Sequence, residues 1–551
     1  MKTSIQQWAL LGGAPEFAQP LHVGRPNVGD RAELMERIGR ILDARWFTNY
    51  GACVQELEAQ LAAHLGVRHC ITVCNATVGL EIAARALGLE GEVIVPSLTF
   101  VATAHALQWQ QIRPVFCDVD PATHCIDPAQ IERLITPRTT GIVGVHLWGR
   151  VCAVDELQAV ADKHGLTLMF DAAHAFGCSA GGRRVGGFGR AEVFSFHATK
   201  FFNTFEGGAI TTNDDALAAK LRLMTNFGFA GYDNVIHVGT NGKMNEVCAA
   251  MGLASLKAVD GFVDVNRRNR AAYRAGLAAV PGATLFEFDE RESNNYQYVV
   301  VEYEPTRGGP TRDDLVRLLW AENVIARKYF WPGCHKMEPY RTLYPEAGAV
   351  LPHTDAIAAR LLILPTGTGV SIADVERICT LIATAVEQGA AARQGRGPEP
   401  GVSVRKFIVY AGSFDENIGG EIALHRLCDL LNRQGCRAFL WPSGGRSRAP
   451  MRRSRRAGSS HATSSSARSA SSRPGRHSTR RSRRRPIWSM RSRSTPRSST
   501  ATRWAPSTWC AGSCTSRAFT PGARTTGRTT ASSSTRTRST TRASTRRATT
   551  C

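Results

Sequence analysis

Long apolar runs, a secretory signal and metal-binding cysteine patterns are all missing from this sequence. No apolar run reaches the roughly 18 residues of a membrane-spanning helix, and the N-terminus has only Lys2 and the short run WALLGG, which is not the core of a signal peptide. The 15 cysteines form no CxxC pair and no Cys/His ligand spacing, so the sequence predicts no metal site. Several cysteines lie in or beside apolar segments, as buried free thiols do in a reducing compartment. We therefore expect a cytoplasmic protein that binds no metal and has no membrane partner.

Acidic residues are missing from the C-terminal tail, residues 443–551. The tail contains 26 of the 68 basic residues, all of them Arg, and none of the 46 acidic ones, so residues 1–442 carry 42 basic and 46 acidic side chains, a net charge of −4. The overall charge of +22 therefore belongs to the tail and does not make the rest of the chain a nucleic-acid binder. Its Arg/Ser/Thr composition cannot bury a core. We interpret the tail as a frameshifted translation or, alternatively, as a disordered basic arm that would bind nucleic acid non-specifically and in a salt-dependent way.

Seven short apolar segments between residues 30 and 255 alternate with segments of helical periodicity such as VGLEIAARAL. Apolar strands that alternate with helices are typical of an α/β fold with a mostly parallel sheet covered on both faces. The last two segments follow each other too closely for a helical crossover, so we expect one antiparallel pair there. The predicted strands lie within residues 69–75, 92–98, 113–119, 141–148, 166–173, 191–198 and 207–214.

The remainder of the chain divides into smaller units. After a large domain with an N-terminal arm (1–255), residues 256–388 combine helices with the strand NNYQYVVVEY, which indicates a smaller α+β domain. The Gly/Pro/Ala/Arg-rich residues 389–404 are predicted to form a linker. Residues 405–442 have the pattern of strand, Gly-Gly turn, helix and strand, which is one βαβ unit and too little to fold or to bind a nucleotide alone.

The segment AEVFSFHATKFFNTFEGGAI (191–210) carries Lys200 just past a predicted strand, and the apolar strand LTLMF runs directly into Asp171. Ligands of open α/β sheets bind beyond the carboxyl ends of strands. An amine and a carboxylate in that position suit pyridoxal phosphate (PLP): the lysine forms a Schiff base with the cofactor aldehyde, and the carboxylate keeps the pyridine nitrogen protonated, so that the ring accepts electrons. The alternatives are an ordinary surface lysine and an aspartate paired with an internal Arg or Lys.

Further candidate ligands also follow predicted strands. His174 could stack near the cofactor ring or hydrogen-bond it, or be a satisfied core histidine. The run Asn75-Ala76-Thr77 lies at a strand-to-helix junction, where N–H groups and a hydroxyl suit a phosphate, although any helix N-cap would look the same. Ser195 is a second candidate phosphate ligand. Phe100 could lie flat on the ring, although an aromatic residue at a strand end more often belongs to the core.

Together these segments resemble the DegT-type sugar-nucleotide aminotransferases, PLP enzymes of fold type I. The resemblance covers residues 25–385, in the family's order, through TNYG (48–51), NAT (75–77), PSLTFVAT (96–103), VFCDVDPATHCIDP (115–128), VHLWG (145–149), DAAH (171–174), SFHATK (195–200), EGGAITTND (206–214) and NGKMNEVCAAMGLASL (241–256). It implies that Lys200 is the catalytic lysine. It implies cofactor contacts from Asp171, His174, Ser195, Ala76, Thr77 and Phe100.

The resemblance further implies a homodimer with shared active sites, in which Asn241 reaches the cofactor phosphate of the neighbouring subunit. Family members that dehydrate sugars carry His at the lysine position, so Lys200 argues against that branch. Arg190 stands where relatives usually have Asp, beside the site.

Within the family, the segments around Lys200, 326–341 and 364–369 look most like enzymes that make dTDP-4-amino-4,6-dideoxyglucose from the 4-keto-6-deoxy sugar, with L-glutamate as amino donor. Arg327, Tyr329 and His335 would line the sugar-nucleotide site or, alternatively, pack in a domain interface. A 3-keto or a GDP-linked sugar is an open alternative. Because residues 405–442 resemble the start of a two-Rossmann-domain glycosyltransferase, the chain could also be the remnant of a bifunctional aminotransferase-glycosyltransferase.

Overall fold

The computed structural model describes residues 1–394, 406–411 and 437–442. Its largest element is a seven-stranded sheet in the order β2-β10-β9-β6-β5-β3-β4, and all seven predicted strands lie in it. These strands are β2 (His69–Val73), β3 (Glu92–Pro96), β4 (Arg113–Cys117), β5 (Thr139–Val145), β6 (Thr167–Asp171), β9 (Glu192–Ser195) and β10 (Gly208–Thr212). The predicted α/β fold class is therefore confirmed.

Strand β10 runs against the other six. It pairs antiparallel with β9, as the short connection predicts, and also with β2, which the sequence did not predict. The remaining pairings in the sheet are parallel. Because β2, β6 and β9 point the same way, the segments that follow them meet at one edge of the sheet.

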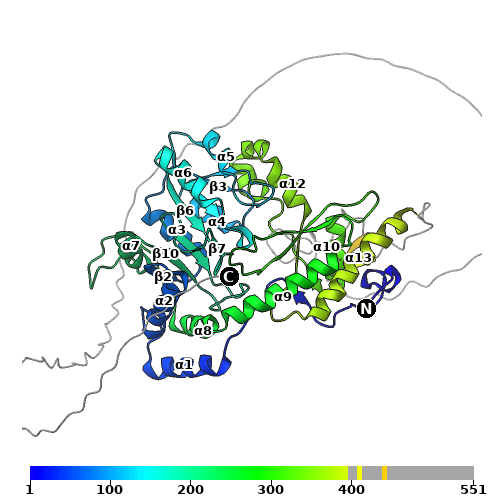
Figure 1. The fold of residues 1–551 in the computed structure, drawn as a ribbon, viewed down its shortest axis with the longest axis horizontal. Coiled ribbons are helices and arrows are strands. Elements are labelled where there is room, and N and C mark those ends of the chain that lie inside the picture. The colour runs from blue at the N-terminus through cyan, green and yellow to red at the C-terminus, as the bar shows by residue number, and fades with distance from the viewer. Residues whose placement is uncertain (395–405, 412–436, 443–551) are drawn as a thin grey trace, which may run out of the picture. The chain divides into compact units, whose positions relative to one another are not determined.

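Helices cover both faces of this sheet (Figure 1). Successive strand residues face opposite sides, so Met169 of β6 packs in one core while its neighbours Leu168 and Phe170 pack in the other. The core that contains Met169 also contains residues of α3 (Ala76–Ala86), α4 (Ala102–Gln108) and α7 (Asp215–Thr225). The core on the opposite face contains residues of α1 (Arg31–Ala44), α2 (Ala52–Leu65), α6 (Val154–His164) and α8 (Glu246–Leu256). Within the described residues, we find no helix with the length and apolarity needed to cross a membrane.

A smaller domain follows, built on a three-stranded antiparallel sheet in the order β11-β12-β14. The capping box of Thr311 and Asp314 fixes the start of α10, and α9 lies beside α13 (Figure 1). The elements are α9 (Val259–Leu277), β11 (Ala283–Leu285), β12 (Val299–Tyr303), α10 (Arg312–Ala321), β13 (Val324–Ile325), α12 (Pro352–Arg360), β14 (Leu361–Leu364) and α13 (Ile372–Gln394).

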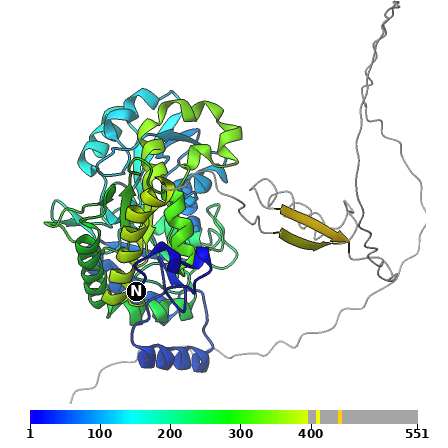
Figure 2. The same cartoon turned by 90° about the vertical axis from the view of Figure 1, so that its right-hand side faces the viewer.

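Besides several 3-10 helices, the described residues include the shorter elements β1 (Leu21–His22), α5 (Pro128–Ile131), β7 (Ser179–Ala180), β8 (Arg183–Arg184) and α11 (Tyr340–Leu343). Further along, β15 (Lys406–Ala411) and β16 (Arg437–Pro442) form a parallel pair (Figure 2), as the two strands of a βαβ unit do. The helix predicted between them, most of the linker and the tail lie outside the described residues.

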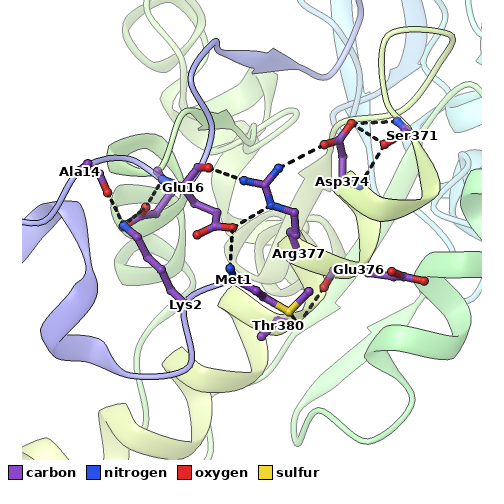
Figure 3. A network of polar contacts seen from close by, with 10 residues as sticks. Met1, Lys2, Ala14, Glu16, Ser371, Asp374, Glu376, Arg377 and Thr380 are labelled. Carbon is purple, nitrogen blue, oxygen red and sulfur yellow. Dashed lines mark hydrogen bonds and ion pairs between the residues drawn. The ribbon is translucent and has the colours of Figure 1, made fainter.

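The N-terminal segment, which the sequence assigned to the large domain as an arm, packs on the small domain. Trp8 and Phe17 belong to the small-domain core, and β1 pairs with β13. The buried carboxylate of Glu322 accepts from the Lys2 amine and from the backbone N–H groups of Ala9 and Glu16. Figure 3 shows the neighbouring contacts, in which the Glu16 carboxylate accepts from Arg377 Nε at 2.7 Å.

We expect Glu322→Ala to lower the free energy of unfolding by roughly 2–3 kcal/mol, because it leaves an ammonium and two backbone N–H groups without their partner. Urea unfolding followed by circular dichroism measures the change. The matched control is Glu304→Ala, whose carboxylate is 73% exposed and pairs with Arg360 on the surface, so that less than about 1 kcal/mol should be lost. Equal losses in the two variants would contradict the anchoring role of Glu322.

Candidate active site

The carboxyl edge of the large sheet opens into a cavity of about 670 Å³. Its walls come from the segments after β2, β3, β6 and β9 and from two small-domain segments, around Tyr298 and residues 327–330. The predicted site residues that line it are Ala76, Thr77, Phe100, Asp171, His174, Ser195, Lys200, Arg327 and Tyr329. Segments far apart in the sequence thus meet because their strands end at the same edge.

Asp171, the last residue of β6, is 5% exposed. Its Oδ2 accepts from Thr103 Oγ1 at 2.7 Å, and its Oδ1 accepts from the Ala173 N–H at 3.1 Å. Burial raises the pKa of the Asp171 carboxyl, and the Thr103 hydrogen bond opposes that shift. A buried carboxylate with so few protein partners suits a cationic group in the cavity.

Lys200 follows β9 in a turn closed by the bond from its N–H to the His197 carbonyl. Its Nζ donates to the Tyr298 hydroxyl at 3.1 Å. Burial lowers the pKa of Lys200 to about 8, although Asp171 and Tyr329 act in the opposite direction. At pH 7 about a tenth of the amine is therefore unprotonated, far more than for an ordinary lysine, and this is the form that attacks a carbonyl or accepts a proton.

His174 lies in a layer of aromatic rings. Its ring is nearly parallel to those of Trp148 and Phe330, at centroid distances of 6.0 Å from each, and its Nδ1 accepts from the Trp148 N–H at 3.2 Å. Burial moves the pKa of His174 well below its ordinary value, and the Lys200 charge adds to this shift. His174 therefore presents a neutral, flat face of the kind that packs against a heteroaromatic ring.

The start of α3 forms the candidate phosphate end of the cavity. The Asn75 side chain caps the helix by accepting from the Val78 N–H at 2.9 Å, which leaves the first N–H groups, those of Ala76 and Thr77, for a ligand. Gly208 of β10 allows this close approach, because a Cβ there would lie 3.0 Å from the Ala76 nitrogen. Ser195 lines the same cavity.

Arg327, Tyr329 and Phe100 also line the cavity, and the side chains of Arg327 and Phe100 are exposed. The Arg327 guanidinium sits over the Tyr329 ring at 5.3 Å from its centroid, and Phe100 is 56% exposed at 5.9 Å from Phe330. A cation above an aromatic ring and an exposed second ring are groups that bind a phosphate and a flat base.

Two predicted site residues do not line the cavity. His335 is 2% exposed. Its Nδ1 is 2.6 Å from Ser97 Oγ, and its Nε2 is 3.2 Å from an Asp355 carboxylate oxygen. The ring therefore packs residues 334–336 against the segment that follows β3 and does not face the cavity. Asn241 is exposed and bridges Asn226 through its backbone. Its predicted contact is with a neighbouring subunit and stays a prediction.

Sequence reasoning missed Thr103, Trp148, Tyr298 and Phe330. Thr103 and Trp148 belong to the segments PSLTFVAT and VHLWG, which carry the family resemblance. Those segments do not by themselves indicate that Thr103 hydrogen-bonds the Asp171 carboxylate or that the Trp148 ring stacks with His174. Tyr298 and Phe330 come from the small domain, and only its docking brings them to the cavity.

The residues present fit PLP. They offer an amine with a lowered pKa for an aldehyde, a buried carboxylate for a protonated ring nitrogen, a flat neutral histidine and helix N–H groups for a phosphate. Among the described residues, no group of His, Cys, Asp and Glu side chains could hold a metal ion.

Comparison with known proteins decides the family. The profile of the DegT/DnrJ/EryC1/StrS aminotransferase family matches residues 29–383. The chain belongs to this family. It is therefore a PLP-dependent aminotransferase, and the cofactor predicted from Lys200 and Asp171 is confirmed.

The alignments with individual relatives cover most of each relative's length. The chain is 36% identical over 363 residues to the dTDP-4-amino-4,6-dideoxy-D-glucose transaminase of Escherichia coli, an alignment that covers 65% of this chain and 97% of that protein. It is 36% identical over 342 residues to the GDP-perosamine synthase of Caulobacter vibrioides, covering 61% and 91%. Among solved structures, DesI in the presence of its TDP-sugar product is 51% identical with a TM-score of 0.68, covering 71% of this chain and 98% of that one.

The lowered pKa of Lys200 predicts a specific pH dependence of stability in the cofactor-free protein. Well below pH 8, Lys200 is protonated in both the folded and the unfolded protein, and the folded protein bears the full cost of burying the charge. Between pH 8 and 10.5 the unfolded chain still binds the proton, whereas the folded protein has released it. The free energy of unfolding therefore rises with pH over this range. Relative to Lys200→Met, the wild type should gain roughly 2–3 kcal/mol over this range, about half of it by pH 9.5.

Urea unfolding at pH 7.5, 8.5 and 9.5 measures this difference. The control is Lys163→Met, which removes a lysine whose side chain is 62% exposed and should keep the wild-type pH dependence. Parallel curves for the wild type and Lys200→Met would show that the Lys200 amine is not buried.

Proposed function

We propose that this protein transfers an amino group from L-glutamate to the C4 carbonyl of a dTDP-linked 4-keto-6-deoxyhexose. The observation that carries the proposal is the 51% identity to DesI over nearly the whole of that chain, together with a cavity lined by Lys200, Asp171 and Arg327. The E. coli transaminase of the dTDP sugar supports the same assignment.

A GDP-linked sugar is the second candidate, because the GDP-perosamine synthase is as similar to this chain in percentage identity as the E. coli transaminase is. The exposed side of the cavity, with Arg327, Tyr329 and Phe100, is compatible with either nucleotide. We give preference to dTDP on the strength of the higher identity to DesI.

In this reaction the transferred amino group comes from glutamate, and the amine of Lys200 carries protons. When bound, PLP supplies an electron sink for the carbon that loses a proton. Lys200, once its amine is free, takes that proton from the amino donor and returns one to the cofactor side; the same exchange in reverse serves the sugar. Tyr298 accepts the hydrogen bond of the amine, and Thr103 donates to the carboxylate of Asp171, which lines the same cavity.

We propose the same residues act in a homodimer in the cytoplasm. The loop between α7 and α8 exposes apolar side chains that an isolated chain would leave in water: Phe227, Phe229, Tyr232, Val235, Ile236 and Val238. Asn241 belongs to the same loop, so a second subunit placed on these apolar side chains would lie beside Asn241. Free cysteines at ten described positions, all but one buried, fit a reducing compartment.

The central experiment uses the full chain loaded with PLP. We expect L-glutamate to bleach the visible absorption band of the lysine-bound cofactor, and the dTDP-linked 4-keto-6-deoxyglucose to restore it. Lys200→Ala should lack this band, because the lysine that binds the cofactor is gone. It should also form 2-oxoglutarate from glutamate at least about 10²-fold more slowly, since the proton carrier is lost, whereas Lys163→Ala on the surface should change neither. Recovery only with a GDP-linked 4-keto-6-deoxyhexose would favour the second candidate, and no response to glutamate would contradict the proposed reaction.

The dimer is tested by light scattering. We expect a mass near twice the 59.8 kDa of the chain, and we expect Phe229→Asp with Val238→Asp to shift it toward one chain and to reduce transamination with it, because a charge in a buried interface is costly. Ile372→Asp, at a 41% exposed apolar position on α13, serves as the control. A monomeric wild type with full activity would contradict shared active sites.

A further inference from the structure

A stretch of the N-terminal segment, residues 21–27, runs between the small domain and the loop that carries Lys200; we call it the N-terminal strap. Its first residues pair with β13, with Leu21 opposite Val324, and Gly24 then forms a parallel bridge with Thr366. Upstream, the segment is fixed to the small domain by the contacts of Glu16 with Arg377 (Figure 3). The strap therefore has a defined path where it reaches the active-site loop.

The strap contacts the main chain on both sides of Lys200. Gly24 lies so close to Thr199 that a Cβ at this position would be 2.6 Å from the Thr199 carbonyl oxygen. Beyond Lys200, Asn27 Nδ2 donates to the Phe201 carbonyl at 2.9 Å, and Asn203 Nδ2 donates to the Asn27 carbonyl at 2.9 Å. The residues before and after the lysine are thus both held by one short segment.

These contacts are buried and also reach the small domain. Asn27 is 2% exposed and Asn203 is 1% exposed, so breaking either bond leaves a polar group without water to replace its partner. Asn27 Oδ1 accepts from Thr368 Oγ1 at 2.6 Å, in a small-domain loop that Asn269 also holds. The lysine amine meets the small domain as well, through the hydroxyl of Tyr298.

We propose that Asn27 is a positioning residue for Lys200. Through Phe201 and Asn203 it fixes the backbone from which the lysine side chain extends, and so fixes where the free amine stands when it carries a proton. Displacement of a reacting group by about 1 Å costs up to 10²-fold in rate, so a looser loop should slow proton transfer while substrate binding changes little. The inference rests on the aminotransferase reaction at Lys200 and does not depend on which sugar is aminated.

The test is a single-turnover reaction of the full-length, PLP-loaded protein with L-glutamate, followed by the bleaching of the cofactor band. We expect Asn27→Ala and Asn203→Ala to react about tenfold or more slowly at saturating glutamate, with the half-saturating concentration changed less than about threefold. With α-deuterated glutamate, both variants should show a larger primary isotope effect than the wild type, because proton transfer limits them more strongly.

The matched control is Asn323→Ala. Asn323 Nδ2 also donates to a backbone carbonyl of the N-terminal segment, that of Phe17 at 2.7 Å, but does so upstream of the strap. It should react within about twofold of the wild type, with an unchanged isotope effect. The side-chain amide is lost in all three variants. Asn323 differs from the other two in its place relative to Lys200, in being only partly buried and in its left-handed backbone (φ 62°).

Each outcome has one meaning. Wild-type rates and isotope effects in Asn27→Ala and Asn203→Ala would overturn the inference, as would an equal slowing in Asn323→Ala. If Asn27→Ala does not fold, Asn203→Ala carries the test, and loss of folding or of cofactor in both would also overturn it, because the two residues would then be structural. A wild-type protein that does not react with glutamate contradicts the proposed function and not the strap.

Discussion

The amine of Lys200 and the carboxylate of Asp171 occupy one cavity, and much of the surrounding structure keeps these two groups out of bulk water. Burial lowers the pKa of Lys200 to about 8 and raises the pKa of Asp171, so each shift favours the neutral form, while the attraction between the groups favours the charged ones. The protein offers them few partners of its own. A ligand with an aldehyde at one end of its ring and a protonated nitrogen at the other satisfies both, which is why this arrangement fits PLP.

The second feature of the site is that the small domain completes it. Phe330 is stacked parallel to Trp148 with centroids 5.5 Å apart, and both rings lie alongside His174. Trp148 Nε1 donates to His124 Nδ1, and the other ring nitrogen of His124 is 3.1 Å from a carboxylate oxygen of Glu302 in β12. This chain of contacts ties the plane of the His174 layer to the small-domain sheet, so that the cavity wall depends on how the two domains dock.

The N-terminal segment connects the same two parts by another path. It is fixed on the small domain through the buried carboxylate of Glu322, pairs with β13, and then reaches the loop of Lys200 at Asn27. The first residues of the chain and the loop of Lys200 are thus joined through buried polar groups that water cannot replace. A segment that adds little to the large core is in this way coupled to the position of a reacting atom.

The sequence alone determined the seven strands of the large sheet and the reversal between β9 and β10, because these depend on local apolar runs and short connections. It also singled out Lys200 and Asp171, which follow such runs and line one cavity. It did not predict the antiparallel pairing of β10 with β2 or the packing of the N-terminal segment on the small domain, since neither is encoded in a local pattern. The sequence also did not show that Tyr298 lines the cavity and hydrogen-bonds the Lys200 amine. It pointed instead to His335, whose ring lies buried between Ser97 and Asp355, outside the cavity. Which side chains enter a cavity between domains depends on long-range docking and on competing buried partners, and only the tertiary structure decides both.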